Sequence, residues 1–244
     1  VRPCPEWLYL AFGTMFAGGR FVGISFTYTD GSDLIAIMEK LKVCSVLVID
    51  PGIDGTNWDI VRKLINISNT GDVTSKQIPY LRHFLGHRFG NKDPGLRTIQ
   101  YIIKFVESDV KLPEVKPSDI MGLFQTSGST GVPKLVTHTH ASVMIVRTFH
   151  GTELYNRRYK LFNNRPFNWI GGFPFGILCG QTRVLLDGFG KPPVDGVARE
   201  IEVIQEEQCE LVMTLPPSIP SFKEREVCTA ILTIMLNIIN ALLY

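Results

Sequence analysis

The chain has 244 residues, a formal net charge of +2, 45% hydrophobic residues and 20% charged residues. This composition is typical of a globular α/β protein and excludes a disordered chain, while the near-neutral charge argues against nucleic-acid binding through a strongly basic surface. The five cysteines are scattered, with no Cys-x-x-Cys pair and no histidine at metal-ligand spacing. They indicate free thiols in a reducing compartment and predict no metal site.

Helical and strand-like patterns alternate along most of the chain. The apolar residues 7–17 before Gly18 and Gly19 imitate a signal-peptide core, but Glu6 in the flank and the aromatic content favour a buried helix. Residues 68–98 are rich in Gly, Asn and basic side chains, which predicts an edge strand and a long loop. The predicted helices are 6–17, 32–41, 59–65, 139–155 and 197–208, and the predicted strands are 20–26, 43–50, 119–124, 159–163, 183–187 and 209–215. This alternation favours parallel sheets covered by helices.

Residues 126–134 read TSGSTGVPK and follow an apolar strand. Small residues let the backbone approach a phosphate closely, hydroxyls donate hydrogen bonds to phosphate oxygens, and Lys134 adds a positive charge. The spacing of Gly128 and Gly131 differs from that of the common nucleotide P-loop and of a serine nucleophile elbow. A flexible linker is the alternative, but linkers rarely join a strand to a new helix or end in Pro-Lys. The run therefore predicts a polyphosphate site.

The same run resembles the ATP-phosphate loop of the adenylate-forming (AMP-binding) superfamily, which includes acyl-CoA synthetases, luciferases and peptide-synthetase adenylation domains. Residues 7–50 are similar to the family's opening helix–Gly–strand–helix–strand block. Residues 165–189 begin RPFNWIGG, similar to the invertebrate-type and medium-chain fatty acyl-CoA ligases. The resemblance covers about residues 6–222. It implies an α/β fold that is the upstream, incomplete part of the family's N-terminal domain, with stacked, mostly parallel sheets and flanking helices.

The resemblance implies a ligase that uses ATP with Mg²⁺ to adenylate a small-molecule carboxylic acid, with a fatty acid favoured, and then transfers the acyl group to coenzyme A. Trp169, beside Gly171 and Gly172, falls next to the family's acyl pocket, where its indole either walls an apolar tunnel or belongs to a core. His138 and His140 are interpreted as loop exit and helix start, and no catalytic residue or metal ligand is assigned. The implied ATP-binding residues are Thr126, Ser127, Gly128, Ser129, Thr130, Gly131, Pro133 and Lys134.

Several motifs of the family do not occur in the sequence. Tyr-Gly-x-Thr-Glu, whose Glu helps to hold Mg²⁺, is missing from the 244 residues. Thr-Gly-Asp, which binds the ribose, does not follow the loop 126–134; the tripeptide occurs only at 70–72, upstream of it. The chain alone is therefore expected to be inactive. Two alternatives stay open: an adenylation domain of the peptide-synthetase or carboxylate-reductase type, and a non-catalytic fragment that binds nucleotide or is tethered to a membrane.

The last residues differ in character from the rest. Residues 223–226 are charged, whereas 227–244 contain no charge and place polar side chains at helical spacing. The sequence thus divides into a partial AMP-binding domain, 1–222, and an apolar tail, 223–244. For the tail, a misread intron is favoured over a packed helix, and a packed helix over a membrane anchor. The expected compartment is cytoplasmic or mitochondrial, with membrane association only through 227–244.

Overall fold

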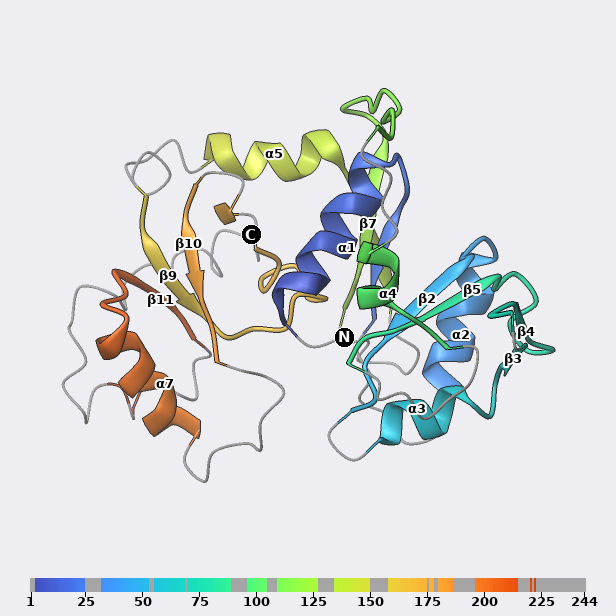
Figure 1. The fold of residues 1–244 in the computed structure, drawn as a ribbon. Helices are drawn as coiled ribbons and strands as arrows, with labels where there is room; N and C mark the ends of the chain where they lie inside the picture. The colour runs from blue at the N-terminus through green and yellow to red at the C-terminus, as the bar shows by residue number, and fades with distance from the viewer. Residues whose placement is uncertain are drawn as a thin grey trace. The chain divides into compact units, whose positions relative to one another are not determined.

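The protein alternates helices with short strands in two compact units, residues 1–138 and 139–244, as the computed structural model shows (Figure 1). The structure describes residues 3–24, 32–52, 55–68, 70–88, 96–104, 109–126, 134–149, 158–174, 176–177, 180–186, 196–214, 220 and 222.

The helices of the first unit are α1 (Pro5–Phe16), α2 (Ser32–Leu41), α3 (Thr56–Val61) and α4 (Ile99–Lys104). Its strands are β1 (Phe21–Gly23), β2 (Val46–Ile49), β3 (Asn66–Ile67), β4 (Val73–Thr74), β5 (His83–Gly86), β6 (Arg97–Thr98), β7 (Ile120–Gln125) and β8 (Leu135–Thr139), the last reaching the boundary. The second unit contains α5 (His140–Phe149), β9 (Lys160–Asn163), β10 (Thr182–Val184), α7 (Gly196–Glu206) and β11 (Leu211–Met213).

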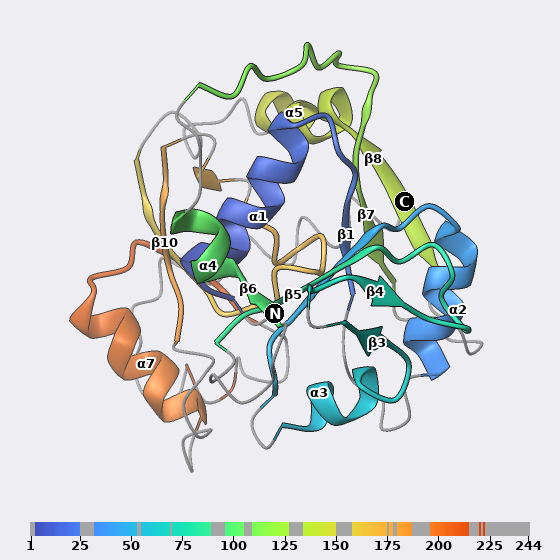
Figure 2. The same cartoon turned by 45° about the vertical axis from the view of Figure 1, so that its right-hand side comes forward.

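The strands form small sheets in which parallel pairing dominates. The first unit contains the sheets β1-β7-β8 and β2-β5-β6, and β10-β9-β11 belongs to the second unit. The pairs β1–β7, β2–β5, β5–β6, β9–β10 and β9–β11 are parallel, whereas β3 and β4 pair antiparallel (Figure 2). The predicted α/β fold with mostly parallel sheets and flanking helices is confirmed.

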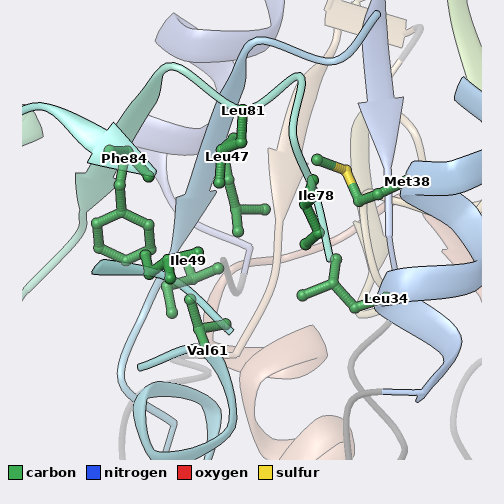
Figure 3. Packing of buried hydrophobic residues seen from close by; sticks show 10 residues of the cluster. Leu34, Met38, Leu47, Ile49, Val61, Ile78, Leu81 and Phe84 are labelled. Atoms are coloured by element: carbon green, nitrogen blue, oxygen red, sulfur yellow. The ribbon is translucent and has the colours of Figure 1, made fainter. Parts of the chain in front are cut away.

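The main core of the first unit lies between the β2-β5-β6 sheet and helices α2 and α3. Leu34 and Met38 occupy one face of α2 and project toward Ile78, as Figure 3 shows. From the sheet, Ile49 of β2 and Phe84 of β5 are each only 2% exposed and belong to the same cluster. The four-residue period of α2 and the two-residue period of β2 thus put their apolar side chains in one interior.

A series of aromatic contacts joins α1 to the β1-β7-β8 sheet. The Trp7 and Phe21 rings meet edge-on with centroids 4.8 Å apart, and the Phe21 and Phe124 centroids are 6.2 Å apart. Gly122 pairs with Phe21 across the two parallel strands, and a Cβ atom there would lie 2.8 Å from the Phe21 carbonyl oxygen. The absence of a side chain at Gly122 therefore lets β1 and β7 approach closely.

In the second unit, α7 covers the sheet in which β9 is central. Ile201, Val203 and Ile204 are the buried residues of α7. They cluster with Phe162 of β9 and with Phe222, which are 1% and 2% exposed. Phe222 is therefore part of this core.

The structure corrects the prediction for residues 68–98. That segment contains β5, which is the central strand of its sheet and not an edge strand. Its sequence, HFLG, offers only two apolar residues between His83 and Gly86, so the signal was weak; pairing with both β2 and β6 stabilises it. Helix α4 and strand β8 were also not predicted. β8 occupies Leu135–Thr139, which the sequence analysis interpreted as loop exit.

The predicted N-terminal helix is confirmed as α1. It ends at Phe16, and Gly18 beyond its C-cap has a φ of +72°, which favours glycine. The Gly18 and Gly19 amides donate to the carbonyl oxygens of Met15 and Thr14. Among the described helices, none is long and apolar enough to cross a membrane. The tail prediction for 227–244 lies outside the described residues.

We expect Gly122→Ala to lower the free energy of unfolding by about 1–3 kcal/mol, because the new methyl group forces β1 and β7 apart. Gly13→Ala is the matched control: a Cβ at Gly13 of α1 meets nothing within 4 Å, so this change should be neutral or stabilising by up to about 1 kcal/mol. Urea unfolding measures both. Equal effects of the two substitutions would contradict the close pairing of the strands.

Candidate functional site

The two ends of the predicted phosphate loop are joined by a backbone hydrogen bond. Thr126 directly follows β7 and Lys134 directly precedes β8, and both are exposed. The Thr126 amide donates to the Lys134 carbonyl oxygen over 2.9 Å. The segment between them, 127–133, which holds the other predicted ATP-binding residues, lies outside the described residues. The loop is therefore closed at its base and begins at the carboxyl end of a parallel strand, the end at which α/β sheets bind ligands.

Buried aromatic packing joins the two strands that flank this loop. Phe124 lies two residues before Thr126, is 2% exposed, and contacts the His138 ring edge-on at 5.5 Å. Burial lowers the pKa of His138, so the neutral imidazole is favoured in this position. His138 lies in β8 and His140 begins α5. His138 thus acts as a packing residue of the strand that leaves the loop.

In the second unit, residues 163–173 form a tight turn after β9. The Gly172 and Phe173 amides both donate to the Trp169 carbonyl oxygen over 2.9 Å. A Cβ at Gly171 would lie 2.5 Å from the Trp169 ring, and one at Gly172 would lie 2.1 Å from the Pro166 carbonyl oxygen. The glycine pair is therefore required by the turn. The indole of Trp169 lies over Gly171 and is 40% exposed, which leaves apolar surface available.

Arg183 of β10 holds this turn together. Its guanidinium donates to the carbonyl oxygens of Asn163 at 2.7 Å, Gly172 at 2.9 Å and Arg165 at 3.3 Å. It also lies over the Phe167 ring, 5.1 Å from the centroid. Burial lowers the pKa of Arg183 to about 9, which still leaves the group charged at neutral pH. The buried cation is stabilised by carbonyl dipoles, and among the described residues no carboxylate pairs with it.

The structure assigns a supporting role to two residues that the sequence analysis missed. Asn163 is 2% exposed, donates to the Gly171 carbonyl oxygen at 3.2 Å, and accepts from the Arg165 amide. Arg183 lies between Thr182 and Val184 in β10, and Asn163 ends β9, which reads KLFN. A polar residue beside apolar ones in a short strand was the only signal available, and it does not reveal burial, since a buried polar group is retained only where the fold supplies its hydrogen bonds.

A family model described as AMP-binding enzyme matches residues 1–224. The chain belongs to the AMP-binding enzyme family. Acetyl-coenzyme A synthetase of Serratia proteamaculans (strain 568) is 28% identical over 120 residues, which are 47% of this chain and 18% of that protein. Acetyl-coenzyme A synthetase of Yersinia pestis (strain Pestoides F) is 26% identical over 124 residues, 48% of this chain and 19% of that protein.

Solved structures of AMP-binding enzymes share the fold. The anthranilate CoA ligase AuaEII superposes with a TM-score of 0.71 at 18% identity, covering 89% of this chain and 39% of that one. Acetoacetyl-CoA synthetase from Streptomyces lividans superposes with a TM-score of 0.70 at 16% identity, covering 92% of this chain and 34% of that one. The chain therefore spans less than half the length of these relatives and corresponds to part of the AMP-binding fold.

We expect Arg183→Lys to lower the free energy of unfolding by about 1–3 kcal/mol, because one ammonium cannot replace a guanidinium fork that serves three carbonyl oxygens. Arg62→Lys is the control. Arg62 forms a surface pair with Asp59 at 3.0 Å and is 58% exposed, so the change should cost at most about 1 kcal/mol. Urea unfolding measures both, and full stability of Arg183→Lys would refute the role of the fork.

We also expect the free energy of unfolding to fall as the pH drops below about 6.5, the ordinary pKa of histidine. Burial lowers the pKa of His138 in the folded chain, so the unfolded chain takes up the proton first and acid favours unfolding. His138→Gln should reduce this dependence, and His87, whose pKa is also lowered by burial, should account for part of what remains. The check is urea unfolding at a series of pH values; an unchanged slope in the variant would exclude His138 as its source.

Proposed function

We propose that this chain is the nucleotide-binding part of an acyl-CoA ligase, which adenylates a carboxylic acid with ATP and transfers the acyl group to coenzyme A. The observation that supports this most is the loop 126–134, rich in hydroxyls and glycine, which the Thr126–Lys134 hydrogen bond closes at the end of β7. Membership of the AMP-binding family and the acetyl-coenzyme A synthetase relatives agree with it.

In this proposal the loop binds the β- and γ-phosphates of ATP. The hydroxyls of Thr126, Ser127, Ser129 and Thr130 donate hydrogen bonds, Gly128 and Gly131 admit the phosphates to the backbone amides, Pro133 ends the turn, and Lys134 supplies positive charge. A carboxylate oxygen then attacks the α-phosphorus, the bond to the β-phosphate breaks, and pyrophosphate leaves. The coenzyme A thiol attacks the acyl carbon and AMP leaves. Positioning and charge neutralisation, with Mg²⁺ as the phosphate counterion, accelerate such a transfer.

For the acid substrate we propose a fatty acid. Trp169 presents an indole that is 40% exposed on a rigid turn, and this apolar surface suits one wall of an acyl pocket. Gly171 keeps the position beneath the ring free of side-chain atoms. An aryl or amino acid is the alternative substrate. The names of two relatives refer to acetyl and anthranilate groups, so the acids of the relatives differ widely.

We propose further that the chain alone binds ATP without turnover. Tyr-Gly-x-Thr-Glu does not occur in it and no Thr-Gly-Asp follows the loop 126–134, so groups that would surround the magnesium ion and the ribose are missing. The partial domain is taken as residues 1–222, with 223–244 as a separate tail. Burial of Phe222 in the core of the second unit supports that boundary.

The test is thermal unfolding with and without MgATP. Saturation at about 100 times the dissociation constant should stabilise the chain by about 2.7 kcal/mol, which corresponds to a rise in Tm of about 5–10 °C. Lys134→Ala should abolish most of this shift because it removes the cation of the loop. Lys116→Ala, an exposed lysine ahead of β7, should keep it. No shift in the wild-type chain would refute the proposed loop function.

Two further measurements separate the remaining alternatives. Pyrophosphate exchange driven by a fatty acid should be absent; its presence would show that the missing motifs are not required. Thermal shifts by stable acyl-adenylate analogues then compare acids without requiring turnover. A larger shift with a medium-chain acyl analogue than with an aminoacyl or benzoyl analogue supports a fatty acid, and the reverse order overturns it.

A further inference from the structure

Three side chains with metal-binding atoms converge at the start of α1. Cys4 is the N-cap of this helix, Glu6 lies in its first turn, and His87 follows β5 directly. His87 Nε2 is 4.0 Å from Cys4 Sγ and 3.6 Å from Glu6 Oε2, and all three ligand atoms lie within 4.8 Å of one another. We propose that Cys4, Glu6 and His87 form a site for a divalent cation of the zinc type, with water completing the coordination.

The geometry is close to that of a zinc site. Zinc bonds of about 2.3 Å to sulfur and about 2.0–2.1 Å to nitrogen and oxygen place tetrahedral ligands roughly 3.3–3.6 Å apart. The distances from His87 Nε2 to the other two ligand atoms, 4.0 and 3.6 Å, exceed this by only a few tenths of an ångström. The Cys4 and Glu6 ligand atoms lie within 4.8 Å of each other, so both side chains must rotate about their single bonds to bring all three atoms to bonding distance. A thiolate, an imidazole and a carboxylate are also a ligand set that zinc accepts.

Two of the three ligands are buried, and the third is partly open to solvent. His87 is fully buried, Cys4 is 5% exposed, and the side chain of Glu6 is 26% exposed. Within the described part of the chain, the buried Oε2 of Glu6 has no hydrogen-bond partner, and its 3.6 Å distance to His87 is too long for a hydrogen bond. A bound cation would satisfy this carboxylate oxygen, and the Glu6 side offers the path of entry.

Two of the three ligands are held in the protonation state that binds metal. The pKa of Glu6 is lowered, mainly by a hydrogen bond from its own backbone amide, so the carboxylate is ionised. Burial lowers the pKa of His87, so the imidazole is neutral; nearby Asp50 and Arg88 act on it in opposite directions. Burial raises the pKa of Cys4 to about 11. Binding must therefore release the thiol proton, and affinity should rise with pH.

The test uses the full chain after chelator treatment, with Zn²⁺ alone as the ligand and neither ATP nor acyl substrate present. Competition with a chromophoric chelator measures affinity and stoichiometry, and Co²⁺ substitution reports thiolate ligation through its near-ultraviolet charge-transfer band. We expect one Zn²⁺ per chain, an affinity that increases with pH, and a cobalt band. Less than one equivalent bound, or a bound ion without the band, would overturn the site.

Variants locate the ion. Cys4→Ser should remove the cobalt band, and Glu6→Gln, at the more exposed ligand, should weaken Zn²⁺ binding by about 10-fold or more with little effect on folding. Cys44→Ser is the matched control, because Cys44 is a partly exposed cysteine outside the proposed ligand set, and its thiol donates to the Val46 carbonyl oxygen at 3.4 Å. Loss of the band in Cys44→Ser, or its persistence in Cys4→Ser, would overturn the assignment. Because no nucleotide is present, the result is independent of the proposed ligase function.

Discussion

The close parallel pairing of β1 with β7 is the constraint on which the packing of α1 against the β1-β7-β8 sheet depends. Gly122 carries no side chain where β7 pairs with Phe21 of β1, and Phe21 contacts both Trp7 of α1 and Phe124 of β7. Phe124 in turn contacts His138 of β8. One glycine thus permits an aromatic series that joins a helix and three strands, among them the two strands that flank the predicted phosphate loop.

In the second unit, a buried charged side chain holds the packing together. Its turn at 163–173 has several carbonyl oxygens pointing inward, and the Arg183 guanidinium satisfies three of them at once. Burying a cation without a carboxylate costs free energy, as the lowered pKa of Arg183 records. In the same segment Trp169 is 40% exposed and its ring lies against Gly171, so a buried cation and an exposed indole belong to one turn.

Sequence patterns predicted the elements whose signal is local. Helix α2 matches its predicted range because its apolar residues recur at helical spacing and the whole period lies within ten residues. β7 follows from its apolar run. β5 was not predicted, because only two of its four residues are apolar. Its place in the sheet depends on β2 and β6, which belong to other parts of the sequence. Short strands are stabilised by their partners, so their own residues identify them poorly.

The same distinction separates the two candidate sites. A phosphate loop uses backbone amides and hydroxyls from consecutive residues, so the sequence TSGSTGVPK is enough to predict its chemistry. The cluster of Cys4, Glu6 and His87 joins residues 83 positions apart, and motif rules that require ligands at short spacing do not detect it. Only the fold, which ends β5 beside the N-cap of α1, brings the imidazole to the thiol. A cation there would link α1 to the β2-β5-β6 sheet, a connection that the aromatic series does not make.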